Sequence, residues 1–500
     1  MNPRSASHRL EWVPIRSARS ADLASAEPGP TIAGVPPTQT TPPAPITTPV
    51  SPAPVVPAWR PRSIAEALEE IGPPRIAALT PEAELIELIK YAAEIEHGLM
   101  VQYLYAMYSS RNPLIQAMLR TIAVEEMGHL ITVQNLLVAG GEGAHLERYD
   151  WSRSPVAPFP LHLEPVSQQL IAKYTACEMP DINSSDIDDA QRELLDDILK
   201  DAQASAGMDP ERIGLLYMKV YWLLRRDDQP SPNSAAEPFD GFPVAQFAES
   251  EPGRHVADEF FKGVATRQAQ TQDWSANNQN VIVRSIAARS DALAAVADIT
   301  EQGEGFGWMP DGHFDRFVAA YKEATGQAEL AQPVPTDPWY GPDDAGRGDL
   351  ADKITSADGE KFARLGDQLY ELTLLGIALG ACLPVDAVSE LRAAAAGATL
   401  HAMRALASVG KMIVSVERDQ GQPPSLNKTA HLCFSRPASW PPEDDPSVLR
   451  ARILAVVDEC IATTEQIRNA TSVPARKASA SSVATLLRNR VRPVFEQIPQ

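Results

Sequence analysis

The chain has 500 residues, 44 of them proline, and a formal net charge of −21 at pH 7. This length allows about two to four ordinary domains and a sizeable buried core. The negative charge argues against a general binder of nucleic acids or anionic membranes, because their phosphate groups repel an acidic protein. We therefore expect neither nucleic acid nor membrane among the partners.

The four cysteines are widely separated and form no CxxC pair: Cys177, Cys382, Cys433 and Cys460. This spacing fits neither a disulfide framework nor a zinc finger, so a reducing compartment is expected. No run of about 18 apolar residues predicts a membrane span. The N-terminus also lacks the apolar stretch of a secretory signal. We expect a cytoplasmic protein.

The first 60 residues hold 13 of the 44 prolines and almost no periodic apolar residues. Such a segment buries too little apolar surface to offset the entropy that ordering costs. The sequence predicts a disordered, proline-rich tail over residues 1–60. It would be a flexible leader or, alternatively, a ligand for a groove-type partner.

From residue 62 onward, alanine, leucine and glutamate recur at helical spacing, which predicts an all-α fold. Thr80 followed by Pro81 is a typical helix start, and Gly140 a typical helix end. No sustained period-two alternation predicts strands. The stretches 140–188, 227–277 and 326–350 are expected to be long loops. The helices are expected at 63–71, 81–109, 112–139, 189–205, 209–226, 278–302, 311–325, 351–382, 384–417, 446–470 and 481–495.

Three ionisable residues lie on the apolar stripes of two successive predicted helices. Glu96 lies in the stripe of helix 81–109, and Glu126 and His129 lie in that of helix 112–139. Burying a carboxylate costs several kcal/mol unless it is paired or bound to a cation. Glu96 and Glu126 are each about 14 residues from the turn, so they lie at the same height in an antiparallel pair.

Carboxylates and an imidazole at one level inside a bundle are typical of half of a dimetal carboxylate centre. The Glu-x-x-His spacing puts Glu126 and His129 on one helix face. The alternative is an internal salt bridge. Glu125 is expected to face outward or to bond a ligand from outside the centre, and His97 to be packed rather than ligating.

A second half-site is predicted where one helix ends and the next begins. Glu301 and Glu304 share a face near the end of helix 278–302, and His313 opens the following helix after a short loop. The ends of these helices must be close in space, so the three side chains can meet. The alternative is that the two acids belong to a solvated turn.

Several segments together carry a resemblance to a known family. They are Ile95-Glu96-His97-Gly98-Leu99 with Gln102-Tyr103-Leu104, Glu125-Glu126-Met127-Gly128-His129, Glu301-Gln302-Gly303-Glu304-Gly305, Gly312-His313-Phe314 with Arg316-Phe317, and the Leu400–Met412 helix. The first two resemble the first and second helices of ferritin-like proteins. As a set, they resemble the ferritin-like domain of the iminophenyl-pyruvate dimer synthases, enzymes of violacein- and rebeccamycin-type pathways.

The resemblance implies a ferritin-like four-helix bundle within residues 61–330, with a helical C-terminal region, 331–500, packed on it. It implies an iron site, di-iron or mononuclear, or a site for another divalent metal. The implied ligands are Glu96, Glu126, His129, Glu301 and His313, with Glu304 as a further candidate. The resemblance also implies that four further residues contact the ligands from outside or line the entrance: His97, Glu125, Gln102 and Tyr103.

The resemblance further implies oxidation of a small amino-acid-derived substrate in secondary metabolism, with an upstream amino-acid oxidase as a partner. Members of the family have an acid in a Gly-Glu-x-Tyr stretch, but this chain has Leu215 at that position. A mononuclear site therefore stays open. Two other functions remain: a non-catalytic metal-binding or scaffold protein, and a metal-free module that docks a partner.

Overall fold

The protein is described here from a computed structural model, which covers residues 76, 80–148, 158–180, 182, 187–207, 213–226, 247–248, 253–261, 266–303, 310–342, 350–422, 427–435, 437 and 445–499. Over these residues the chain is helical, and its β pairings are isolated bridges. The predicted all-α fold is therefore confirmed. The predicted tail and the predicted helix 63–71 lie outside the described residues.

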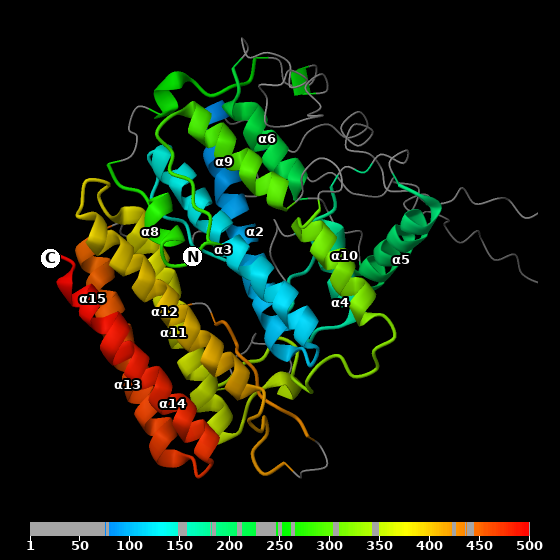
Figure 1. Cartoon of the computed structure of the whole chain (residues 1–500), viewed down its shortest axis with the longest axis vertical. Coiled ribbons are helices and arrows are strands. Elements are labelled where there is room, and N and C mark those ends of the chain that lie inside the picture. Colours follow the sequence, from blue (N-terminus) through cyan, green and yellow to red (C-terminus); the bar gives the residue numbers. More distant parts are fainter. Residues whose placement is uncertain are drawn as a thin grey trace, which may run out of the picture.

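Two long antiparallel helices form the centre of the molecule (Figure 1). α2 spans Pro81–Ser109 and α3 spans Pro113–Ala139. The Thr80 side chain accepts a hydrogen bond from the Ala83 N–H, and Asn112 caps α3 in the same way. Each helix has proline in its first turn, where the missing N–H costs nothing. The sequence thus sets where both helices begin, as predicted.

The second pair of the bundle is interrupted halfway along. α4 (Gln168–Cys177) ends where α6 (Gly214–Leu224) begins, and the Ile213 N–H donates to the Cys177 carbonyl over 3.4 Å. α5 (Asp189–Ala206) lies in the connection between them and packs on α4. α9 (Arg289–Gln302) is followed by α10 (His313–Ala324). α6 packs on α2 and α9, while α10 packs on α3 and α4.

Three predicted elements were wrong. The expected loop 227–277 contains the short helices Asp258–Phe261 and Thr271–Ser275. The expected loop 140–188 contains helix α4, and the expected helix 278–302 begins only at Arg289. The residues before Arg289 are extended, with Val281 and Val283 buried and Ile282 exposed between them. Side chains of α3 hold this backbone in place of a helix. The Arg284 N–H donates to Thr132 Oγ1 over 3.1 Å, and Asn135 Nδ2 donates to the Arg284 carbonyl over 2.7 Å.

A glycine on α3 allows this extended segment to lie close. A Cβ on Gly128 would be 2.6 Å from the Ile282 carbonyl oxygen, which is backbone and cannot swing away. The absence of a side chain at Gly128 therefore lets residues 281–286 lie against the part of α3 that carries Glu126 and His129.

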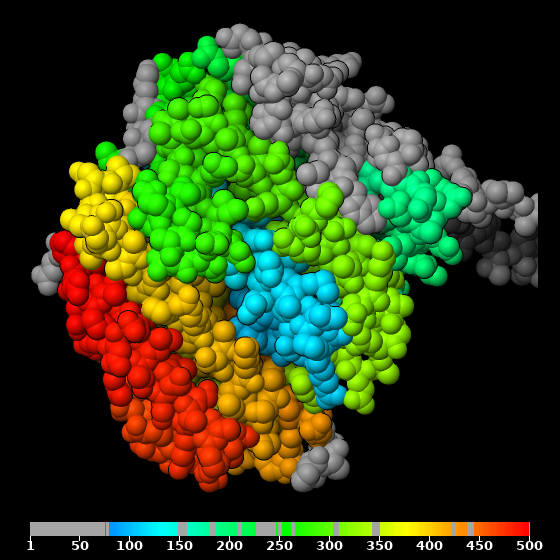
Figure 2. Space-filling view, in the orientation of Figure 1, coloured from blue at the N-terminus to red at the C-terminus, as the bar shows by residue number. Residues whose placement is uncertain are grey.

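The C-terminal helices pack together and against the bundle (Figures 1 and 2). They are α11 (Ala357–Cys382), α12 (Ser389–Ile413), α13 (Pro446–Ala470), α14 (Pro474–Leu486) and α15 (Arg492–Gln497), with a π-helical turn, Leu487–Val491, before α15. α11 also packs on α3, and Gly410 of α12 lies against the Tyr108 ring of α2.

Three shorter helical segments complete the described structure: η3 (Asp258–Phe261), α8 (Thr271–Ser275) and η4 (Leu350–Asp352). Among the helices described, none combines the length and apolar character that crossing a membrane requires.

Candidate metal centre

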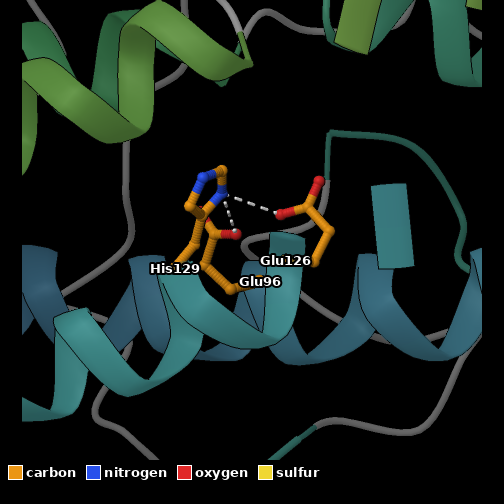
Figure 3. Close-up of side chains that lie close together, drawn as sticks. All are labelled: Glu96, Glu126 and His129. Atoms are coloured by element: carbon orange, nitrogen blue, oxygen red, sulfur yellow. Dashed lines mark hydrogen bonds and ion pairs between the residues drawn. The ribbon is translucent and has the colours of Figure 1, made fainter. Parts of the chain in front are cut away.

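A first group of ligand atoms joins the two continuous helices. Glu96 of α2 and Glu126 and His129 of α3 are all buried, with 2–4 % of their surface exposed. His129 Nδ1 lies 3.1 Å from Glu126 Oε2 and 3.6 Å from Glu96 Oε2. Figure 3 shows both carboxylates turned toward this imidazole nitrogen. The structure therefore brings together the three residues of the first predicted half-site.

A second group lies at the break in the other helix pair. It consists of Glu126 again, Glu178 and His313, all buried. His313 Nδ1 lies 3.0 Å from Glu126 Oε1 and 3.7 Å from Glu178 Oε2. The His129 and His313 rings are 5.5 Å apart between centroids.

Glu126 belongs to both groups and uses a different oxygen in each. Its Oε2 faces His129 and its Oε1 faces His313. A carboxylate with one oxygen toward each of two sites can bridge two metal ions, and the other four residues then supply one carboxylate and one imidazole to each ion. Such an arrangement would suit a dinuclear carboxylate centre.

Each residue that belongs to only one group is held from outside by a hydrogen bond. His129 donates its Nε2–H to Gln302 Oε1 over 2.8 Å, and His313 donates its Nε2–H to Glu125 Oε2 over 3.1 Å. The Tyr217 hydroxyl donates to Glu96 Oε1, and the Tyr103 hydroxyl donates to Glu178 Oε1 over 2.6 Å. Both imidazoles thus present Nδ1 to the centre, which is how outer contacts orient metal-binding histidines.

The pKa shifts in the two groups favour protonated side chains in the absence of a metal ion. Burial and the neighbouring Glu126 raise the pKa of Glu96 to about 8. Burial alone would lower the pKa of His129, but its contacts with Glu126 and Glu96 raise it to about 10. His313 is shifted upward in the same way, with Glu126 as the main partner. Without metal, these pKa shifts favour protonated forms of Glu96 and of the two imidazoles.

Glu126 and Glu125 keep their negative charges under these conditions. Burial would raise the pKa of Glu126, but His313 and His129 hold it far below its usual value. Burial would likewise raise the pKa of Glu125, but His313 and Arg316 lower it. The bridging carboxylate and the outer carboxylate on His313 therefore stay ionised.

The residues fit a bound cation better than a salt-bridge network alone. Glu96 Oε2, Glu126 Oε1 and His313 Nδ1 are buried and form no hydrogen bond of regular geometry, although Glu126 Oε1 lies 3.0 Å from His313 Nδ1 and Glu96 Oε2 lies 3.6 Å from His129 Nδ1. Buried polar atoms without a regular hydrogen bond are rare and need an explanation. The backbone at Gly303 lies close to the second group, since a Cβ there would be 3.1 Å from Glu178 Oε2 and 3.8 Å from His313 Nδ1. Three carboxylates and two imidazoles suit iron, manganese or zinc.

Glu178 is not among the predicted ligands, although it carries the second carboxylate. It follows the last residue of α4, inside a stretch expected to be loop. The apolar spacing of Ile171 and Tyr174 continues to Glu178 at i+3, i+4 steps, so this helix and its acid could have been found. Leu215, at the position where an acid was expected, is buried in α6 and offers no ligand atom.

The other predicted site residues are distributed around the centre. Glu301 is exposed at the end of α9 and belongs to neither group. Glu304 lies outside the described residues. Gln102 accepts from the Tyr174 hydroxyl over 3.4 Å and does not reach the centre in any hydrogen bond that the described residues make. His97 is buried and contacts the Tyr370 hydroxyl of α11 over 2.5 Å, on the side facing the C-terminal helices.

Comparison with known proteins gives the class of the domain. Residues 89–322 match the family model described as "Ferritin-like". The matched segment contains all five residues of the two groups and most of the helices that hold them. The chain is thus an all-α protein that carries a ferritin-like domain over these residues.

Among solved structures, the chain is similar to a ferritin-like protein from Caulobacter vibrioides. The two are 18 % identical, the similarity covers 63 % of this chain and 93 % of that one, and the TM-score is 0.35. No curated protein matches the sequence significantly.

Proposed function

We propose that the protein is a non-haem di-iron oxidase or oxygenase that acts on a small amino-acid-derived substrate in secondary metabolism. The observation that carries the proposal is the pair of buried groups sharing Glu126 inside a ferritin-like domain. Iron bound there would supply redox chemistry with O₂ or peroxide, which the side chains of the centre cannot supply themselves.

The chain's own residues would do three things at this centre. Glu126 would hold the two sites at one separation, because it offers one oxygen to each. Glu125 and Gln302 would fix the imidazoles so that Nδ1 faces inward. The apolar side chains of α2 and α3 around the centre would exclude water and keep a reactive oxidant from side reactions.

The resemblance to iminophenyl-pyruvate dimer synthases supports the amino-acid-derived substrate, and the coupling of two such molecules stays a prediction from that resemblance. Glu178 supports two metal sites rather than one, because it supplies a carboxylate despite Leu215.

The test is anaerobic titration of the purified chain with Fe(II), followed by exposure to O₂. The expected result is about two irons per chain and an O₂-dependent transient absorbance. The matched control carries Glu126→Ala and His129→Ala, which removes the shared carboxylate and one imidazole.

Each outcome decides between functions. Two irons that react with O₂ support the oxidase. Iron that binds but never reacts supports the non-catalytic metal-binding or scaffold protein. Iron content no higher than in the double variant rules out both metal functions.

A further inference from the structure

A surface cavity of about 350 Å³ lies directly outside the two imidazoles. It is lined by residues of four segments: Glu125 of α3, Ile282 and Arg284 of the extended segment, Asp298, Glu301 and Gln302 of α9, and Pro310, Asp311, Gly312 and Arg316 at α10. Its size lies within the range of small-molecule sites.

Two lining residues connect the cavity to the metal centre. Gln302 accepts from His129 Nε2–H, and Glu125 accepts from His313 Nε2–H. Each therefore has one side on a candidate ligand and one side on the cavity. A molecule bound in the cavity would be a single side chain away from both imidazoles.

Two arginines in the cavity use only part of their hydrogen-bonding capacity. Arg316 donates from Nη1 to Glu125 over 2.5 Å, and Arg284 donates from Nε to Asp298. Their remaining side-chain nitrogens make no hydrogen bond to the described residues. The side chains are 25 % and 48 % exposed. A guanidinium presents several donors in one plane, a geometry that suits a carboxylate.

The charge of the cavity lining argues against a simple anion as its ligand. Glu125 and Asp298 are balanced by the two arginines. Glu301 and Asp311 are exposed and have no ion pair within the described structure, so the cavity has a net charge of about −2. A ligand that uses the arginines must therefore also carry a positive group for these acids. Ile282 adds an apolar wall that is 41 % exposed.

We propose that this cavity binds a zwitterionic amino acid with an apolar side chain. Arg284 and Arg316 hold its carboxylate, Glu301 holds its ammonium group, and Ile282 and Pro310 contact its apolar part. The proposal deepens the proposed function and rests on it for the role of the bound molecule, but not for the binding itself. It also gives Glu301 a substrate-binding role in place of the predicted metal ligation.

The test uses three fluorinated probes of similar size, with ¹⁹F NMR to measure their dissociation constants. The probes are 4-fluoro-L-phenylalanine, 4-fluorophenethylamine, which lacks the carboxylate, and 3-(4-fluorophenyl)propionate, which lacks the ammonium group. Binding is measured to the metal-free and the zinc-loaded full chain. The zwitterion should bind about tenfold more tightly than either truncated probe, because each charged hydrogen bond contributes roughly that factor.

Variants assign the contacts. Arg284→Gln and Arg316→Gln should each reduce the preference for the zwitterion over the amine. Glu301→Gln should reduce its preference over the propionate. Arg488→Gln and Glu193→Gln are matched controls: Arg488 is a 44 % exposed arginine paired with one acid, and Glu193 is an exposed acid on α5. Circular dichroism checks that each variant is folded.

The outcomes are separable from those of the iron experiment. Loss of preference in the three cavity variants but not in the two controls supports the proposal, whether or not iron binds. Equal binding of all three probes, no binding of the zwitterion, or variants that behave like the controls overturns it while leaving the metal centre untouched.

Discussion

The two helix pairs of the bundle contribute to the candidate metal centre in different ways. α2 and α3 are continuous, and their candidate ligands Glu96, Glu126 and His129 lie in the middle of the helices. The other pair is broken at the same level. Its contributions come from helix ends, since Glu178 caps α4 and His313 is the first residue of α10. Helical geometry places the first set, whereas the positions of the breaks place the second.

This difference makes the two groups separable by experiment. Only Glu126 is common to both, and each group has its own carboxylate, imidazole and outer tyrosine. Changes in the interrupted pair should affect the second group alone if the two sites are as distinct as the geometry indicates.

The largest effect is expected from removing one carboxylate. Glu178→Ala should lower the metal content from about two ions per chain to about one, because the second group would keep only Glu126 and His313. Glu96→Ala should do the same at the first group. The measurement is Co(II) titration followed by visible absorbance and metal analysis.

Glu193→Ala, on the exposed face of α5, is the control and should bind as the wild type does. If Glu178→Ala still binds two ions, the end of α4 is not part of the centre.

The pH dependence of folding stability should differ between the metal-free and the metal-loaded protein. Between pH 4.5 and about 8 the folded chain keeps a proton on Glu96 that the unfolded chain has lost, so stability without metal should fall as pH rises. His129, with a pKa raised from 6.5 to about 10, extends this loss to higher pH. Metal binding displaces these protons, so affinity should rise steeply with pH.

The measurement is chemical denaturation from pH 5 to 9 with and without zinc. Glu96→Gln has no such proton to keep and should flatten the metal-free profile between pH 4.5 and 8. A metal-free profile that rises with pH in the wild type would show that the centre is not held by these protons.

A smaller effect is expected from the outer tyrosines. Tyr217→Phe removes the hydrogen bond to Glu96, and Tyr103→Phe removes the one to Glu178. Outer contacts of this kind contribute about 10- to 100-fold to metal affinity. Each variant should weaken one site only, which competition with a metal-sensitive dye can resolve.

Tyr105→Phe is the matched control, because its buried hydroxyl donates to the Pro335 carbonyl instead of a ligand. Equal weakening by all three variants would indicate loss of packing rather than loss of ligand orientation.

The smallest effect is expected at Gly303. A Cβ there would enter the space beside Glu178 and His313, so Gly303→Ala should weaken the second site severalfold and leave the first unchanged. Gly141→Ala is a poor control, because the φ of Gly141 is +82° and any side chain there would strain the backbone. Gly380, whose Cβ would meet the Trp274 ring away from both groups, serves better. Isothermal titration with Zn²⁺ measures both steps.

The sequence alone determined most of what α2 and α3 contribute to the candidate site. Thr80 and Asn112 followed by proline set the helix starts, and the apolar stripes show which face is buried. Since 3.6 residues make a turn, the same stripes place Glu96, Glu126 and His129 inside the bundle and at one height. Ionisable groups on a buried stripe predict that an oppositely charged group or a cation lies next to them, because burying an isolated charge costs too much free energy.

Only the tertiary structure decided how the interrupted pair completes the centre. Glu178 and His313 are distant in sequence from Glu126, and no local periodicity says that the end of α4 and the start of α10 reach the same point. Their meeting depends on where α6 and α9 pack. It also depends on the extended segment before Arg289, which Thr132 and Asn135 hold although the local sequence pattern predicts a helix there. It is for this reason that Glu301, a plausible ligand by spacing, lies in the cavity wall, while Glu178 lies in the centre.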